Sequence, residues 1–454
     1  THLIGTPTST TAEGIQVLNP GDAAIRFTFF TVVSCIYYIG YTCQCVVTKS
    51  AQTCLTNDPK QRPLFTIFNT VGSMAGMGLM QFLAPIVRSN VADYSSADFY
   101  AFLTPIGISV SIILSILAII GIWEKDNPKY FGIGGEKQEK TKISEYVEII
   151  KHNNPMQRLM VAGAGCKLAL SIATNVTVLC MLYGCMMGNY DGLYLPMMIV
   201  GYVFSVPFFL LTVRTSQKYG QKASLTRYTT LALVMYAGVL VLLFMWNQGS
   251  MATTLSLFTV APFRININLY TILFVVLFGL GYGAYYATAD MPIPMVADCS
   301  DYETYRSGKY VPGIMGTLFS LVDKLVSALG STIVGIALAM IGIHTLPDAE
   351  TPYAPGMKTV VIVLFCVVPM LAWVATLWAM KGYKLTGEKM KEIQAVNMAR
   401  KQAIENGMST EEAMQKWQTI ADVPEECMGA VIEKMGRRKG DLLGMTPMGN
   451  RYRL

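Results

Sequence analysis

Charged residues are scarce in this chain. They make up 14% of its 454 residues, whereas hydrophobic residues make up 52%. Soluble domains carry about a quarter charged residues, and a large buried core would not explain so low a share. The sequence therefore predicts a polytopic membrane protein.

Signatures of catalysis and of metal binding are missing as well. Only three histidines occur, none within a predicted span, and no nucleophile–base pair or phosphate-binding loop is recognisable. We therefore expect no enzyme. The ten cysteines lack the paired spacing of zinc sites, and several lie in apolar runs. They are expected to be reduced thiols, with no metal site and no cofactor.

A nucleic-acid site and a signal peptide are absent too. The net charge of +6 comes without a basic run interleaved with aromatic residues. Basic loops on the inner side of a membrane account for this charge better than a nucleic-acid partner does. Residues Thr1 to Asp22 have no Met start and no basic n-region, so no signal peptide is predicted.

Nine apolar segments are long enough for transmembrane helices, each of which needs about 20 residues. The chain is therefore expected to be all-α. The segments lie at 25–47, 65–87, 99–123, 157–187, 193–213, 227–247, 268–296, 313–342 and 358–380. The loops between them alternate between basic and neutral. Basic loops stay in the cytoplasm. The basic loop 124–156 and the C-terminal tail are therefore expected on the cytoplasmic side of the cell membrane.

These features divide the chain into four parts. A partial N-terminal helical bundle (1–123) precedes a Lys/Glu-rich cytoplasmic loop (124–156). A six-helix C-terminal bundle (157–380) precedes a polar cytoplasmic tail (381–454). The run from Ser409 to Glu412 is typical of a helix start. A solvated amphipathic tail is favoured over a dedicated partner-binding module.

The stretch 282–342 contains the most informative charged residues of the chain. Its two apolar runs flank a charged segment, Asp298 to Lys309, that we predict to be a hairpin. Asp290 lies in the first run, and Asp323 and Lys324 lie in the second. Charges within a span are costly and face a cavity or each other. Asp323 points about 100° round the helix from Lys324, so Lys324 is predicted to pair with Asp290.

The first and seventh spans have a similar layout. Each has a Tyr-rich entry and a polar middle, and each leaves into a short acidic–basic turn. Carriers are commonly built from two repeated halves. If the first span is the repeat mate of the seventh, two or three helices are missing upstream. This chain alone is then expected to show weak cation-coupled accumulation of substrate.

Three motifs carry a family resemblance. They are Met295-Val-Ala-Asp298-Cys-Ser-Asp301-Tyr-Glu-Thr-Tyr-Arg306 followed by Lys324, Gly382-Tyr-Lys-Leu-Thr-Gly387, and Leu55-Thr-Asn-Asp58-Pro-Lys-Gln-Arg62. Together they resemble the glycoside–pentoside–hexuronide:cation symporters, the melibiose-carrier branch of the major facilitator superfamily. The resemblance implies twelve helices around a central sugar cavity that opens alternately to each side of the inner membrane. It also implies symport of a glycoside, oligosaccharide or hexuronide with Na⁺ or H⁺.

The chain departs from this family in its first half. The resemblance puts Cys45 where melibiose-type carriers have a sugar-binding aspartate, and the family's cation-binding acids lie on a helix that this chain lacks. A lysophospholipid or other amphiphile carrier, and a non-transporting membrane sensor or scaffold, therefore remain alternatives.

The candidate site residues fall into two groups. Aromatic rings and amides suit sugars, carboxylates accept hydroxyl protons, and Lys167 suits an anionic substrate unless it snorkels to the interface. Tyrosines at these positions could equally serve helix packing. The predicted substrate residues are Lys324, Asp290, Tyr41, Gln44, Cys45, Tyr285, Tyr286, Ser320 and Lys167. The predicted gating residues, which would form ion pairs at the cytoplasmic hairpins, are Asp58, Arg62, Asp298, Asp301 and Arg306.

Overall fold

The structure is a computed structural model of the chain. It describes residues 8–10, 16–18, 20–50, 62–91, 97–124, 143–259, 264–265, 267–343, 347, 351–419, 446–447 and 452–453. The chain divides into two units, Thr1–Lys49 and Ser50–Leu454, and each is described by itself.

The first unit is a short hairpin followed by one long helix. Strand β1 (Thr8–Thr10) pairs antiparallel with β2 (Gln16–Leu18), and α1 (Pro20–Ser50) follows. The run Ala24–Val47 of α1 is long and apolar enough to cross a membrane. Most of its large apolar side chains are exposed, as expected for a helix that faces lipid or another helix.

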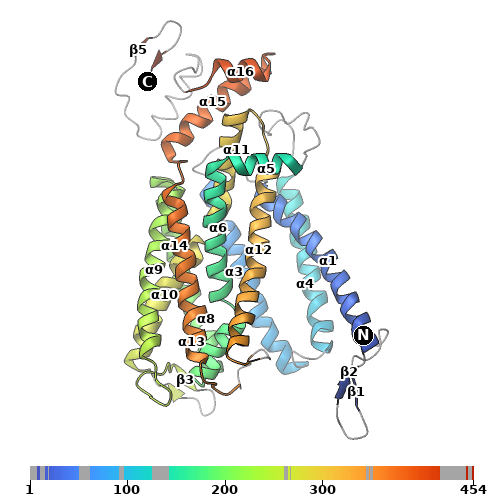
Figure 1. Ribbon diagram of the computed structural model, residues 1–454, viewed down its shortest axis with the longest axis vertical. Helices are drawn as coiled ribbons and strands as arrows, with labels where there is room; N and C mark the ends of the chain where they lie inside the picture. The colour runs from blue at the N-terminus through green and yellow to red at the C-terminus, as the bar shows by residue number, and fades with distance from the viewer. Residues whose placement is uncertain are drawn as a thin grey trace. The chain divides into compact units, whose positions relative to one another are not determined.

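The second unit is almost entirely helical, which confirms the predicted all-α class (Figure 1). The helices before the long C-terminal spans are α3 (Arg62–Asn90), α4 (Ala97–Ile122), α5 (Ile143–His152), α6 (Asn154–Ala173), α7 (Val176–Leu179), the π-helix η3 (Cys180–Met186), α8 (Tyr190–Tyr219) and α9 (Gln221–Met245). The rest are α10 (Leu269–Ala289), α11 (Pro292–Ser307), α12 (Pro312–Met340), α13 (Met357–Ile362), the π-helix η4 (Val363–Val367), α14 (Val368–Lys381), α15 (Gly387–Glu405) and α16 (Thr410–Lys416). Two small hairpins are formed by β3 (Phe258–Thr259) with β4 (Arg264–Ile265) and by β5 (Thr446–Pro447) with β6 (Tyr452–Arg453).

Every predicted span coincides with a helix or a chain of helices. Among the described residues, seven helices are long and apolar enough to cross a membrane, and a bent pair, Asn154–Ala173 with Val176–Met186, adds an eighth. The two members of that pair meet at 46°. Helix α3 covers the expected span 65–87, but only Val71–Met80 forms an apolar stretch within its described part. The chain is a multi-pass membrane protein.

The predicted hairpin from Asp298 to Lys309 is wrong. Helix α11 continues to Ser307, and the chain turns only at Gly308, whose φ of 74° lies in the left-handed region that favours glycine. The acidic–basic sequence suggested a turn, but Glu303 and Arg306 are spaced for an ion pair along one helix and make it, at 2.6 Å. The described span therefore runs from Leu269 to Ser307.

This span is too long for a bilayer. Its 39 residues would extend about 58 Å as a helix, whereas the hydrocarbon core is about 30 Å thick. The end of α11 therefore projects beyond the membrane. A break separates α10 from α11 at Asp290 and Met291, because Pro292 has no N–H to continue the α10 hydrogen-bond ladder.

The core of the second unit lies among α6, α8, α9, α10 and α14. Helices α6 and α14 approach so closely that a side chain on Gly165 would overlap the Ala372 carbonyl and the Thr376 hydroxyl. The Thr376 hydroxyl donates to the Ala162 carbonyl at 3.1 Å, across the same contact. On the other side of the bundle, a Cβ on Gly283 of α10 would lie 2.7 Å from the Phe204 carbonyl of α8. Small residues at these crossings allow close backbone packing.

Helices α6 and α12 lie side by side and run parallel (Figure 1). Three levels of contact show this. Gly163 packs on Phe319, Lys167 pairs with Asp323, and Ser171 packs against Gly330. The residue number rises on both helices from one level to the next, so the two helices point the same way. This register decides which charges meet.

Candidate functional site

Four polar, partly buried side chains form two pairs among the helices of the second unit. Lys167 Nζ of α6 lies 3.7 Å from Asp323 Oδ1 of α12. Asn69 Nδ2 of α3 donates to Asp290 Oδ2, at the end of α10, over 2.8 Å. These four residues and Lys324, which follows Asp323, are called the polar layer below.

The two pairs lie at nearly the same depth. Pro292 and Phe319 both approach Gly163. Helices α6 and α11 are antiparallel, because Asn153 contacts Glu303 while Gly163 meets Pro292. Residues Lys167 and Asp290 are therefore displaced from the Gly163 level in the same direction, by about 6 Å and about 3 Å at 1.5 Å per residue.

Lys167 and Asp323 of the polar layer lie well inside their helices, whereas Asp290 lies at the end of α10. Lys167 is the fourteenth residue of α6, which begins at Asn154, so it lies about 20 Å from that end. Asp323 lies about 16 Å from the start of α12 at Pro312. Charged side chains near the centre of a membrane are costly, and they mark substrate or ion sites unless they serve packing alone.

The Lys167–Asp323 pair was missed by the sequence reasoning. That reasoning left Lys167 between substrate binding and snorkelling, and it considered Asp323 only as a partner of Lys324. The Lys167 and Asp323 side chains are 36% and 18% exposed, so the pair is partly open to its surroundings. No local sequence pattern predicts the Lys167–Asp323 pair, because the pairing depends on the register of two helices more than 150 residues apart in the sequence.

The predicted pairing of Lys324 with Asp290 stays a prediction. The Asn69 amide is a partner of the Asp290 carboxylate, and Asn69 was not anticipated either. Lys324 is partly buried in α12. It lies one turn beyond Ser320, and residues four apart share a helix face.

Ser320 is fully buried, and its hydroxyl has no hydrogen-bond partner within the described part of the chain. A buried hydroxyl without a partner costs about 1–3 kcal/mol. A bound water or a substrate hydroxyl would remove that cost. This keeps Ser320 among the candidate substrate residues, on the same face of α12 as Lys324.

Tyr285 and Tyr286 lie in an aromatic cluster of the core. The Tyr285 ring contacts Tyr236 at 5.8 Å and Trp373 at 5.3 Å between centroids, and the Tyr286 ring stacks on Tyr282 at 5.4 Å. Both side chains are buried. Their place in the structure fits helix packing, and their role as substrate ligands stays a prediction.

Tyr41, Gln44 and Cys45 belong to α1 in the first unit and are described there alone. The Tyr41 ring stacks on the Tyr37 ring of the preceding turn, at 6.1 Å. Tyr41 and Cys45 are four residues apart, so they share one face of the helix.

The structure places the predicted gating residues in different surroundings. Asp58 lies outside the described residues, and of Arg62 only its place at the start of α3 is described. Asp298 is buried on α11, and the Asp301 carbonyl accepts from Asn397 at 2.9 Å. Arg306 pairs with Glu303 on its own helix. A gating role for these residues stays a prediction.

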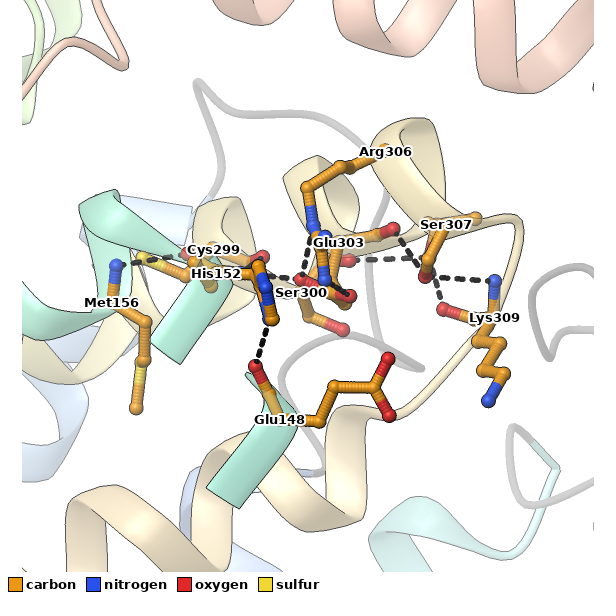
Figure 2. A network of polar contacts seen from close by, with 11 residues as sticks. Glu148, His152, Met156, Cys299, Ser300, Glu303, Arg306, Ser307 and Lys309 are labelled. Atoms are coloured by element: carbon orange, nitrogen blue, oxygen red, sulfur yellow. Dashed lines mark hydrogen bonds and ion pairs between the residues drawn. The ribbon is translucent and has the colours of Figure 1, made fainter. Parts of the chain in front are cut away.

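A buried network joins α11 to the start of α6 (Figure 2). The side chain of Asn153 is fully buried, and its Nδ2 donates to Glu303 Oε2 at 2.9 Å and to the Cys299 carbonyl at 3.3 Å. Its Oδ1 accepts from the Met156 amide and so caps α6. An asparagine followed closely by Pro155 is a recognisable helix start, so this role of Asn153 was readable from the sequence.

No group of three or more His, Cys, Asp or Glu side chains suitable for a metal ion occurs among the residues that the structure describes. The polar layer combines two carboxylates, two ammonium groups and an amide. Such a set can accept sugar hydroxyls, bind a carboxylate or exchange a proton.

A bundle of membrane-spanning helices that carries an ion pair and an amide–carboxylate pair fits a membrane transport protein. The MFS/sugar transport protein family matches residues 11–387. This match covers most of the chain, which therefore belongs to that family. The predicted resemblance and the predicted major facilitator superfamily class are confirmed.

Two curated proteins are similar over shorter stretches. The "Uncharacterized 29.9 kDa protein in crtE 3'region" of Pseudescherichia vulneris is 35% identical over 123 residues, 27% of this chain and 43% of the relative. The "Putative glycoside/cation symporter YagG" of Escherichia coli (strain K12) is 29% identical over 99 residues, 22% of this chain and 21% of the relative. The chain thus matches less than half the length of either relative.

Proposed function

We propose that this protein carries a glycoside, oligosaccharide or hexuronide across the membrane together with Na⁺ or H⁺, by alternating access. The observation that carries the proposal is the polar layer, at mid-depth in a chain of the MFS/sugar transport protein family. The name of one relative, a putative glycoside/cation symporter, points to the same substrate class.

Each pair of the polar layer can exchange its partner for substrate. A carboxylate accepts hydrogen bonds through two oxygens, so a sugar hydroxyl can take the place of the Asn69 amide on Asp290. Lys167 can likewise release Asp323 to bind a hexuronide carboxylate. In such an exchange Asp290 and Lys167 keep a partner, and the displaced Asn69 amide and Asp323 carboxylate would bind other substrate groups or water.

The position of Asp290 also suits a conformational change. Asp290 ends α10 at the break before Pro292, and its partner Asn69 lies on α3, a helix of the N-terminal part. Substrate that displaces Asn69 would loosen the link between α3 and the broken span. Binding would thereby favour one arrangement of the helices over another.

Uptake by proteoliposomes tests this function. Radiolabelled methyl α-galactoside, methyl β-glucuronide and lysophosphatidylcholine are compared, each with and without an inward Na⁺ or H⁺ gradient. We expect saturable uptake of one of the two sugars that a gradient stimulates. Uptake of the lysolipid alone would replace the sugar carrier by an amphiphile carrier, and binding without uptake of any probe would favour a sensor.

A variant pair tests whether the site is the polar layer. Asn69→Ala removes the donor to Asp290 and is expected to change the half-saturating sugar concentration about tenfold, since a hydrogen bond to a charged group contributes about 1.5–3 kcal/mol. Ser73→Ala, one turn along α3 at an exposed position, should leave it unchanged. Equal values for both variants and the parent would place the sugar elsewhere.

Loop charge supports one orientation in the membrane. We infer that the protein lies in the inner membrane with the loop 124–156 and the C-terminal tail in the cytoplasm. An impermeant thiol reagent on intact cells should label a cysteine at position 190 and spare one at position 137. The reverse pattern would invert the topology.

A further inference from the structure

The C-terminal tail is docked on α11 instead of being a freely solvated segment. Helices α15 and α16 lie beside the end of α11 (Figure 1). Val396, Ala399, Ala413 and Trp417 form a small buried cluster, and Tyr305 of α11 packs against it. The tail therefore has an apolar core of its own, with α11 as one of its walls.

Arg400 lies at the centre of this contact. Its side chain is buried, and the residue is only 4% exposed. Its Nη1 donates to the Tyr305 carbonyl at 2.7 Å, while Nε and Nη2 donate to the Trp417 carbonyl at 2.9 Å and 2.6 Å. One guanidinium thus bridges α11 and the end of α16.

The carbonyls that Arg400 binds are the ones that helices leave without partners. Tyr305 lies in the last turn of α11, and Trp417 follows the last residue of α16. Carbonyls at helix C-termini lack intrahelical donors, and a cation there also meets the negative end of the helix dipole. Burial lowers the pKa of Arg400, but a guanidinium remains protonated at any physiological pH.

Further contacts surround the same turn of α11. Lys389 Nζ and the Arg400 guanidinium each lie over the Tyr305 ring, 5.3 Å from its centroid. The Tyr305 hydroxyl donates to the Gln418 carbonyl at 2.8 Å, and Asn397 Nδ2 donates to the Asp301 carbonyl at 2.9 Å. Burial acts to lower the pKa of Lys389, but its hydrogen bond to Glu392 and the nearby Tyr305 raise it overall.

Helix α11 connects this surface to the polar layer. It runs unbroken from Pro292 to Ser307, so its two ends move together. One end begins two residues after Asp290, and Arg400 binds the Tyr305 carbonyl in the last turn at the other end. Asn153, at the start of α6, also binds this part of α11, through the Glu303 side chain and the Cys299 carbonyl.

We propose that the Asp301–Tyr305 face of α11 is a docking surface for the chain's own tail, α15 and α16. Arg400 is the positioning residue that holds α11, and with it Asp290, in the arrangement seen here. Undocking the tail frees α11 and alters the equilibrium between the conformations of the carrier. The docking stands on the contacts alone, whereas its effect on transport rests on the proposed function.

Hydrogen exchange of the full-length protein in lipid nanodiscs tests the docking without any substrate. Arg400→Ala is expected to speed exchange about tenfold or more in peptides covering 298–307 and 396–417, because it removes bonds to carbonyls at two helix ends. Arg400→Lys should fall between this variant and the parent, since one ammonium cannot bridge as the planar fork does. Lys391→Ala removes a charge from a partly exposed position on α15 and should exchange like the parent.

Two outcomes would overturn the docking. One is an unchanged exchange rate at 298–307 in Arg400→Ala, and the other is an equal increase in Lys391→Ala. If Arg400→Ala fails to insert, Tyr305→Phe serves in its place. That change removes only the hydroxyl that binds the Gln418 carbonyl and should speed exchange at 298–307 to a smaller extent.

Uptake of radiolabelled methyl α-galactoside or methyl β-glucuronide per inserted molecule tests the second part. Arg400→Ala should change the rate about fivefold or more, the usual size of coupling between sites, while Lys391→Ala leaves it unchanged. Faster exchange with an unchanged rate would leave the docking in place and overturn its control of transport. If neither the parent nor any variant transports sugar, the proposed function fails, while the exchange result still decides the docking.

Discussion

Two membrane-spanning helices of similar apolar character behave very differently. The span Asp98–Ile122 of α4 buries none of its most apolar window, whereas the span Met357–Lys381, which contains α14, buries 56%. Helix α4 carries its own aliphatic side chains on all of its faces. Helix α14 instead presents Thr376, Trp373 and a backbone carbonyl to its neighbours.

The comparison separates insertion from association. An apolar composition is enough to place a helix in lipid. It does not bring two helices together, because lipid tails are as apolar as leucine and give no hydrophobic drive. Close contacts at small residues, interhelical hydrogen bonds and aromatic pairs do so, and among the described helices these gather in the bundle formed by α6 to α14.

The largest expected effect comes from filling the closest helix contact. Gly165→Leu places a side chain where the Ala372 carbonyl and Thr376 lie, and overpacking of this kind costs about 3 kcal/mol. Gly107→Leu in α4 has open space around it and should change little. Thermal unfolding in detergent measures both. Equal melting temperatures would show that α6 and α14 do not pack as the structure has them.

The next effect concerns charged residues within the spans. The bundle carries them at mid-depth, whereas the α4 span has no charged residue after Asp98. Lys324→Ala is expected to abolish sugar binding while the protein still inserts, with at least a tenfold loss of affinity if the substrate contacts the ammonium. Equilibrium binding of the sugar measures this.

A double change then tests the partner of Lys324. If Lys324 pairs with Asp290, the combination of Lys324→Ala with Asp290→Ala should be more stable than either single change, because neither charge is left alone. Normal binding by Lys324→Ala, or a double variant no more stable than the singles, would leave Lys324 with a structural role only.

The smallest effect is expected at the partly exposed pair. Lys167→Ala deprives Asp323 of its ammonium partner, but solvent screening at this exposure limits the loss of stability to about 1 kcal/mol. Adding Asp323→Ala should restore that stability. Thermal unfolding of the three variants measures the coupling. A double variant no more stable than Lys167→Ala would show that the 3.7 Å approach contributes nothing.

Local patterns in the sequence account for the helices. Runs of about 20 apolar residues located a helix at each of the nine expected positions, and eight of these are long and apolar enough to cross a membrane in their described part if the bent pair is counted as one. The start of α16 was also predictable. Ser409 accepts from the Glu412 amide at 3.2 Å, and the Glu412 side chain accepts from the Ser409 amide at 3.2 Å, which is the reciprocal cap that the motif encodes.

The tertiary structure decided the site and the fate of the charged segment. Asp298 to Lys309 was predicted as a hairpin, but it is helical to Ser307, where Asn153 at the start of α6 binds the Glu303 side chain and Arg400 of the tail binds the Tyr305 carbonyl. The partners of Lys167 and Asp290 likewise depend on the parallel register of α6 with α12 and on the place of α3. Contacts between residues so far apart in the sequence have no local signature, because they depend on how whole helices pack.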